Sequence, residues 1–311
     1  MLGEYYKAAT QAAAVTELDS FGVVKLTGAD RVSWLQGMIT NDVDKLLPGG
    51  GCYAAHLTPQ GKIVAHMYVY KDDDALWLSL ERAALPKLLA AFDRLLITED
   101  VQVVDASDTY SILSVLGPRA AAALEGWLGG PLHFQECYAH RSIGECRITY
   151  SRLGYDIWVR RGEANSVMRS LVEWGVTAID YGTWDVVRTE AGIPVYGIDI
   201  DETTTMPELG EEGIRYDKGC YIGQEVVAKI KYIGHVNRRF VGLRISGNVP
   251  EMKSPIRKGG RDVGYTTTTV FSPALNQPIA LGFVSRSAYA PGTEVEVGTG
   301  TATIVDLPFR R

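Results

Sequence analysis

The segment Lys218–Glu225, with the sequence KGCYIGQE, places a cysteine between two glycines and close to a lysine. Gly219 and Gly223 permit backbone conformations and close approaches that a Cβ atom hinders, so the segment can bend around a partner or ligand. Lys218, together with backbone amides at the start of a following helix, would stabilise a Cys220 thiolate, the nucleophilic form of cysteine. The competing interpretation is a buried, inert cysteine that fills a small gap. The residues alone favour neither interpretation.

A second candidate is Glu190, in the segment GTWDVVRTEAGIP. This segment predicts a short helix with Thr183 as N-cap, ending at Gly192 in the C′ position with Pro194 beyond it. Glu190 then lies in the last turn, where the negative end of the helix dipole disfavours a carboxylate by typically ~0.3–1 kcal/mol. A solvated side chain or an ion pair with Arg188 would explain why a glutamate is tolerated at this position. The alternative is a carboxylate held to accept two parallel N–H donors from a ligand such as an amino-substituted heterocycle.

The cysteine and histidine spacing predicts no metal site. No C-x-x-C pair occurs, and no cysteine has a histidine nearby at metal-ligand spacing. His56 and His66 lie in expected strands, where lone histidines are commonly hydrogen-bonded structural residues. Without a secretory signal, the cysteines are expected to remain thiols. They are Cys52, Cys137, Cys146 and Cys220.

Strands and helices alternate through the first three quarters of the chain. The runs CYAAHLT, KIVAHMYVY and ALWLSL predict an antiparallel meander, and RAALPKLLAAFDRLL predicts a helix with Pro86 in its first turn. An earlier helix would begin at an Asp30 N-cap and end before Thr40. A second round follows with strands DVQVVD, YSILSVLG, CRITYS and YDIWVR and helices PRAAAALEGWL and ANSVMRSLVEW. This alternation predicts an α+β fold.

After about Asn237 the composition changes to short β-rich runs separated by glycine and proline, which predict a separate all-β unit. These runs are RRFVGLRI, RDVGYTTTTVF, PIALGFVS, GTEVEV and TATIVDL. A chain of 311 residues exceeds the usual size of one hydrophobic core, so two or three packed units are expected.

Composition and charge exclude several functional classes. Apolar residues make up 46% of the chain and charged residues 22%, which is typical of a soluble globular protein. The net charge of −6, with scattered Lys and Arg, argues against a general nucleic-acid binder. No apolar run approaches the ~20 residues of a membrane helix and no signal peptide is evident, so a cytoplasmic protein is expected. Glycine-rich nucleotide motifs, G-x-S-x-G and H-E-x-x-H are absent.

The segment KGCYIGQE resembles the signature of the YgfZ-type folate-binding proteins, which are relatives of the glycine-cleavage T-protein (GcvT, aminomethyltransferase). Other segments resemble that superfamily in the same order, so the resemblance covers nearly the whole chain. They are GADRVSWLQGMITNDV, GYDIWV, RTEAGIPVYGIDIDETT, VGYTTTTVFSPALNQPIALGFV, GTEVEV and VDLPF.

The resemblance implies a three-lobed clover, in which two ferredoxin-like α/β units and a C-terminal β-barrel surround a central folate cavity. The α+β body would span residues 1–236, with two interleaved units of which the second covers roughly 48–108, and the barrel would span residues 237–311. This agrees with the α+β and all-β patterns that the residues predict.

The resemblance also implies how tetrahydrofolate or a one-carbon derivative would bind. The family's pterin-binding glutamate falls on Glu190, whose carboxylate would accept hydrogen bonds from the pterin ring N–H and amino group. Tyr150 would line the cavity. Arg238, with Arg239 as the alternative, would bind the folate glutamate carboxylate, a role that suits a fork-shaped guanidinium.

One departure separates two branches of the superfamily. Aminomethyltransferases carry an aspartate for one-carbon transfer on a strand where this chain has Ala65 and His66. The resemblance therefore implies a folate-binding accessory protein that supports iron–sulfur cluster assembly or repair, with assembly proteins or client enzymes, including tRNA-modifying ones, as partners. Cys220 would be its reactive thiol, assisted by Lys218. It could contact a cluster, attack an electrophilic one-carbon adduct or sense an oxidant.

Two alternatives remain open. One is a folate-dependent one-carbon transferase in which His66 or another group replaces the missing carboxylate. The other is an interaction module whose cavity is vestigial.

Overall fold

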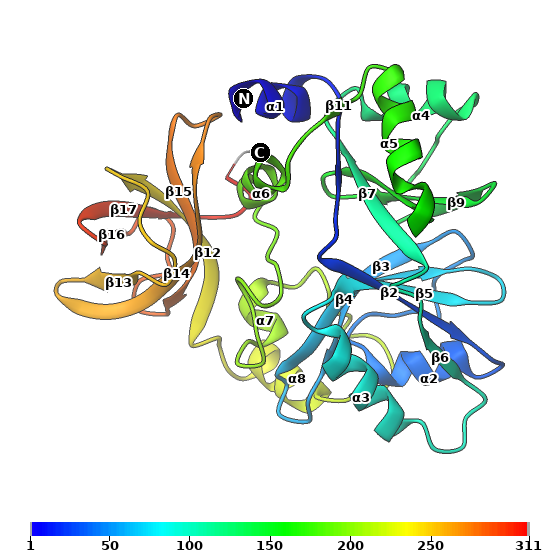
Figure 1. Ribbon diagram of the computed structural model, residues 1–311. Helices are drawn as coiled ribbons and strands as arrows, with labels where there is room; N and C mark the ends of the chain where they lie inside the picture. Colours follow the sequence, from blue (N-terminus) through cyan, green and yellow to red (C-terminus); the bar gives the residue numbers. More distant parts are fainter. Residues whose placement is uncertain (1, 310–311) are drawn as a thin grey trace. The chain divides into compact units, whose positions relative to one another are not determined.

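The structure, a computed structural model, describes residues 2–309 (Figure 1). The chain divides into two compact units. The body unit combines the residues up to Thr183 with Glu212–Gln224, and the barrel unit combines Trp184–Glu211 with the residues from Glu225 onward. The expected succession of two α/β sheets and a β-barrel is confirmed within the described residues.

One sheet of the body unit is a five-stranded antiparallel sheet that contains the expected meander. Its strands, in spatial order, are β3 (Gly51–Leu57), β4 (Ile63–Lys71), β5 (Leu76–Glu81), β2 (Phe21–Thr27) and β6 (Gln102–Asp105). Helix α3 (Leu85–Leu95) has a proline in its first turn, as expected. Asp30 precedes helix α2 (Arg31–Met38), but its side chain makes no cap bond. The N-cap position of Asp30 is confirmed, but its carboxylate accepts a hydrogen bond from the Asp100 N–H at 2.8 Å instead of capping the helix.

The second sheet of the body unit has six strands, and only the β1–β11 pair is parallel. In spatial order they are β11 (Thr177–Ala178), β1 (Ala14–Glu17), β7 (Tyr110–Leu116), β10 (Gly154–Arg160), β9 (Cys146–Ser151) and β8 (His140–Ile143). The helical segments around it are α1 (Leu2–Gln11), α4 (Ala120–Leu128), the 3-10 turn η1 (Arg161–Glu163) and α5 (Ala164–Glu173).

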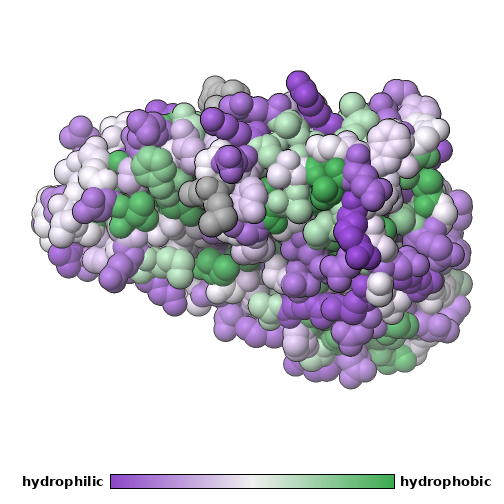
Figure 2. All heavy atoms as spheres, turned by 45° about the horizontal axis from the view of Figure 1, so that its top comes forward, coloured by the Kyte–Doolittle hydropathy of each residue, from purple (hydrophilic) through white to green (hydrophobic). Residues whose placement is uncertain are grey.

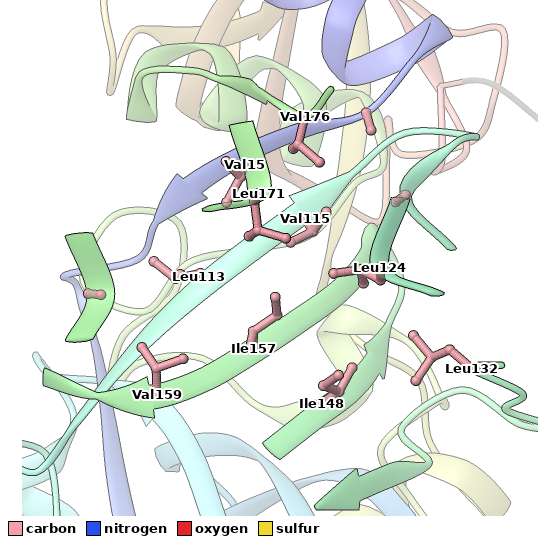
Figure 3. Packing of buried hydrophobic residues seen from close by; sticks show 13 residues of the cluster. Val15, Leu113, Val115, Leu124, Leu132, Ile148, Ile157, Val159, Leu171 and Val176 are labelled. Atoms are coloured by element: carbon pink, nitrogen blue, oxygen red, sulfur yellow. The ribbon is translucent and has the colours of Figure 1, made fainter. Parts of the chain in front are cut away.

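The hydrophobic core of this sheet follows the two-residue period of a strand. Leu113 and Val115 on β7 and Ile157 and Val159 on β10 are fully buried, and Leu171 of α5 packs over them (Figure 3). Ser114 and Trp158 alternate with them on the opposite face of the sheet and are also buried, so both faces of these strands are covered.

Arg147 is the centre of a polar network that links the two sheets of the body unit. Its guanidinium donates to both carboxylate oxygens of Asp72 and to Nδ1 of His140, at 2.7 Å in the latter case. The guanidinium also lies over the rings of Trp77 and Trp158, with its Cζ atom at 4.9 and 5.7 Å from the ring centroids. His140 donates from Nε2 to the Lys71 carbonyl, so its ring is held neutral.

This network makes stability fall in acid. Burial, and then the charge of Arg147, lower the pKa of His140 to about 4 from 6.5. The unfolded chain therefore binds more protons between these values, so the contribution is complete above pH 6.5 and is lost as the pH falls towards 4. The expected loss is about 3 kcal/mol.

Urea titrations of the unmodified protein and of His140→Asn between pH 7 and 4 measure this loss in the free energy of unfolding. The variant keeps the opposing contribution of Asp156, whose pKa burial raises to about 6, so the difference isolates His140. Parallel stability curves for the two proteins would contradict the assignment.

The barrel unit contains a closed barrel of six strands among the described residues. In spatial order they are β12 (Arg238–Ser246), β15 (Gln277–Ser285), β14 (Arg261–Ser272), β13 (Pro255–Lys258), β16 (Glu294–Val297) and β17 (Gly300–Val305). All but β13 were expected. Helix α7 (Met206–Leu209) contacts β12. Helices α6 (Tyr181–Glu190) and α8 (Gln224–Tyr232) each cross the division between the units.

No helix in residues 2–309 is both long and apolar enough to span a membrane. Hydrophobic residues on the face shown in Figure 2 form small patches among hydrophilic ones.

Candidate functional site

The loop that carries Cys220 is anchored to the body unit by Lys218. Its ammonium group donates to three backbone carbonyls, of Gln36, Ile39 and Asn41, each at 2.7 Å. These carbonyls lie at and just beyond the end of α2, where helix carbonyls lack intrahelical partners and favour a cation. Burial lowers the pKa of Lys218 to about 8, because loss of water disfavours the charged form.

Gly223 holds the other end of the loop. Its φ is +84°, and a Cβ atom there would lie 2.6 Å from the Thr58 carbonyl oxygen, in the turn between β3 and β4. The expected close backbone approach is therefore confirmed for Gly223. For Gly219 it was wrong, since an added Cβ would meet nothing within 4 Å. The Ile222 N–H also donates to the Gly37 carbonyl at 3.3 Å, so the loop is fixed at several points.

The Cys220 side chain is exposed between these anchors. Because the three N–H donors of Lys218 are engaged by carbonyls, that ammonium has none left for the sulfur. The geometry gives Lys218 an anchoring role, and its catalytic role stays a prediction. Among the other thiols, Cys137 is also exposed, whereas Cys52 is buried and burial raises its pKa to about 12.

Glu190 is the last residue of helix α6 and is only 5% exposed, so it is not a solvated surface carboxylate. Its Oε1 accepts a hydrogen bond from the hydroxyl of Ser272, at the end of β14. Gly192 follows the helix with a φ of +70°, and the Ile193 N–H bonds the Arg188 carbonyl, which confirms the expected helix end.

The expected start of this helix was wrong. Helix α6 begins at Tyr181, and the carboxylate of Asp180 caps it by accepting from the Thr183 N–H at 2.7 Å. Thr183 thus lies inside the first turn instead of preceding it.

A buried ion-pair network fixes this helix within the barrel unit. Arg188 is fully buried and donates to Asp185 and Asp199, and to the Thr268 hydroxyl at 2.8 Å. Asp199 also accepts from the hydroxyls of Thr267 and Thr268. A buried carboxylate and guanidinium need this level of satisfaction to be tolerated. The network therefore holds the turn that carries Glu190 against β14.

Ala65, where the resemblance places the transferase aspartate, is buried, and that correspondence stays a prediction. The adjacent His66 is also buried, with its Nε2 at 2.9 Å from Glu81 Oε2 and its Nδ1 at 2.8 Å from the Tyr53 hydroxyl. A carboxylate that orients an imidazole is the arrangement of a general base. Both ring nitrogens of His66 are thus engaged by protein groups, as expected for a structural histidine.

Tyr150 lies on β9, where its ring stacks on Phe134 with centroids 6.2 Å apart and contacts Tyr155 at 5.3 Å. Its role in lining a folate cavity stays a prediction.

Arg238, at the start of β12, is engaged by protein groups. Its guanidinium donates to Glu208 at 3.1 Å and to the Tyr265 hydroxyl at 3.0 Å, and lies over the Phe283 ring at 4.4 Å. Arg239 is exposed, with its guanidinium 5.0 Å from the centroid of the Tyr289 ring. Binding a ligand carboxylate at Arg238 would require displacement of Glu208. The assignment of either arginine to this role stays a prediction.

A cavity of about 520 Å³ lies in the body unit beside edge strand β3. It is lined by polar groups from residues 41–46, 51–53, 136–138 and 212–217, including Asp42, Lys45, Glu212 and Arg215. No group of three or more His, Cys, Asp or Glu side chains in the described part of the chain is placed to hold a metal ion.

Sequence reasoning missed Ser272 and the anchoring contacts of Lys218. Ser272 meets Glu190 across 82 residues of chain, and Lys218 meets carbonyls at least 177 residues away. Neither contact has a local sequence signal.

The chain is similar to known proteins in both sequence and structure. Residues 2–214 match the family model described as GCVT N-terminal domain, and residues 238–310 match the glycine cleavage T-protein C-terminal barrel domain. The chain is 29% identical over 327 residues to an aminomethyltransferase of Nostoc sp., covering 98% of this chain and 87% of that protein. An aminomethyltransferase of Bacillus subtilis is 27% identical over 324 residues, with coverage of 98% and 89%.

Among solved structures, the glycine cleavage system aminomethyltransferase T from Bartonella henselae has the same fold. The TM-score is 0.91 at 20% sequence identity, and the match covers 99% of this chain and 89% of that one.

Proposed function

Because the chain belongs to the glycine cleavage T-protein (GcvT) family, which binds tetrahydrofolate, we propose that it binds a reduced folate through Glu190 and acts as a YgfZ-type accessory protein. Its role would be to support iron–sulfur cluster assembly or repair in client enzymes, including those that modify tRNA. Cys220 would be the reactive group.

The carboxylate of Glu190 supports the folate part of the proposal. It is buried, and one oxygen is oriented by Ser272, so it is held in place before a ligand arrives. A pterin offers a ring N–H and an amino group side by side, which suit the two oxygens of one carboxylate. The glutamate tail of the folate would pair with Arg238 or Arg239.

The observation that carries the accessory role is the exposed thiol of Cys220 on a loop anchored at both ends. A fixed loop presents the sulfur in one place, and exposure allows a protein partner or its cluster to reach it. The same chain has Ala65 where an aminomethyltransferase needs its carboxylate. The presence of the thiol and the absence of the carboxylate therefore both favour the YgfZ-type branch of the family.

A second candidate function is folate-dependent one-carbon transfer. It is favoured by the His66–Glu81 pair, which could supply a base beside the missing carboxylate, and by relatives named aminomethyltransferase. In this case Cys220 would be dispensable for turnover.

A transfer assay separates the two functions. With purified protein, tetrahydrofolate and an aminomethyl or formaldehyde donor, we expect no turnover above the uncatalysed rate, because the placed carboxylate is absent. Robust turnover that His66→Ala abolishes would overturn the accessory role and establish the transferase.

A further inference from the structure

The body unit has a second cavity, of about 370 Å³, and none of the proposed folate-binding residues lines it. It lies between the C-terminal half of α3, the turn between β3 and β4, and Ile222 of the loop that carries Cys220. We call it the α3 groove. Its walls are mostly apolar, with His56, Thr58 and Arg94 as the polar lining residues. The apolar ones are Leu57, Pro59, Val64, Ala91, Leu95 and Ile222.

His56, a buried residue, supplies a hydrogen-bond acceptor to the α3 groove. The residue is 2% exposed, and its Nδ1 lies 2.7 Å from the Met38 carbonyl oxygen. A carbonyl only accepts, so Nδ1 carries the proton and the neutral ring has its lone pair on Nε2. The ring packs edge-on against Phe92, which fixes its orientation. Burial lowers the pKa of His56, which keeps the ring neutral near pH 7.

No hydrogen-bond donor within residues 2–309 reaches Nε2, and this atom is not among the wholly buried unpartnered side-chain atoms of the described chain. Nε2 is therefore an acceptor without a protein partner on a side chain that is otherwise buried, and a ligand, an ion or water commonly pairs with such an atom. Because His56 lines the α3 groove, a ligand there could supply the missing donor.

Arg94 gives the α3 groove a positive charge. It lies in the last turn of α3 and is exposed, and its Nε makes only a long bond, at 3.3 Å, to the Ala90 carbonyl. No carboxylate in the described part of the chain lies within ion-pair distance of it, and no acidic residue lines the groove. The charge of Arg94 is therefore available to a ligand.

We propose that the α3 groove binds a small amphipathic carboxylate with an apolar ring or chain and, opposite its carboxylate, a hydroxyl or N–H donor. The donor would bond His56 Nε2, the apolar body would fill the space along α3, and the carboxylate would pair with Arg94. Sites of this size typically combine apolar walls with a few placed polar groups. Glu190 is not among the residues that line the groove, and the proposal does not depend on folate binding.

Three probes test this assignment by NMR titration of protein labelled with ¹⁵N. 4-Hydroxyphenylacetate has both groups, phenylacetate lacks the donor, and tyramine replaces the carboxylate with a cation. We expect the hydroxy acid to bind about tenfold more tightly than phenylacetate and to shift the His56 Nε2 resonance. Tyramine should not bind.

Variants assign the two contacts. Arg94→Gln should weaken both acids about tenfold, because a charge-assisted bond is lost. His56→Phe should remove the preference for the hydroxy acid. Lys87→Gln, on the exposed side of the same helix, should change neither affinity.

The proposal is overturned if neither acid binds saturably below about 10 mM, if the two acids bind equally to the unmodified protein, or if tyramine binds as well as they do. If His56→Phe does not fold, the Nε2 shift and the Arg94→Gln result still decide the matter. An apolar peptide that binds without a carboxylate requirement would replace the small acid as occupant and equally overturn it.

Discussion

Replacing Cys220 with serine should abolish the protein's function in cells while leaving its fold intact. The side chain is exposed and the loop is held by Lys218 and Gly223, so the oxygen analogue removes the nucleophile without disturbing the anchors. The free energy of unfolding should change by less than about 0.5 kcal/mol, as for other exposed substitutions. In a strain that lacks this gene, Cys220→Ser should fail to restore the activity of iron–sulfur enzymes, including those that modify tRNA.

Cys137→Ser is the matched control, because Cys137 is also an exposed thiol of the body unit. It should complement fully. If Cys220→Ser restores the enzymes as well as the unmodified gene does, Cys220 returns to the inert role and the accessory function loses its reactive group.

Replacing Glu190 with glutamine should remove folate binding. The amide keeps the volume and one acceptor oxygen but loses the charge and one of the two parallel acceptors. Loss of a charge-assisted pair in a buried site is expected to weaken binding about 100-fold. Calorimetry with tetrahydrofolate should show about micromolar affinity for the unmodified protein and none for the variant in the same range.

Glu173→Gln is its control, because Glu173 is also the last residue of a helix, α5, but is exposed. Its affinity should be unchanged. Ser272→Ala should give an intermediate loss, since the carboxylate remains but is no longer oriented by the hydroxyl. Equal affinity for Glu190→Gln and the unmodified protein would remove Glu190 from the site.

The elements with strong local patterns were predictable from sequence. The alternating strands of the meander, helix α3 with its early proline, and the left-handed Gly192 after α6 are all where the sequence indicated. Each is determined by interactions within a few residues, so its signal is local. The boundary expected at residue 236 stays a prediction; the compact division instead assigns residues 184–211 to the barrel unit.

Strand β13 and the start of helix α6 were not predicted correctly, because they depend on contacts that a local pattern does not contain. Strand β13 carries Pro255, Arg257 and Lys258 and has only Ile256 buried, so it is a strand because its barrel neighbours pair with it. The start of α6 depends on the Asp180 cap, which competes with Thr183 as a signal. Helix caps and short barrel strands such as β13 are decided by side-chain orientation and by tertiary pairing, which composition does not report.

The candidate residues of the site were predictable from the sequence, but the contacts that hold them in place were not. Glu190 and Cys220 stood out because one opposes a helix dipole and the other lies in a glycine-rich segment. Ser272, the Asp199 network and the carbonyls around Lys218 come from distant parts of the sequence, so no spacing rule could find them.

The most direct test of the central claim, folate binding through Glu190, is a crystal structure of the protein with tetrahydrofolate. The account predicts that the pterin N–H and amino group lie within hydrogen-bond distance of the two Glu190 oxygens. A folate bound away from Glu190 would contradict it.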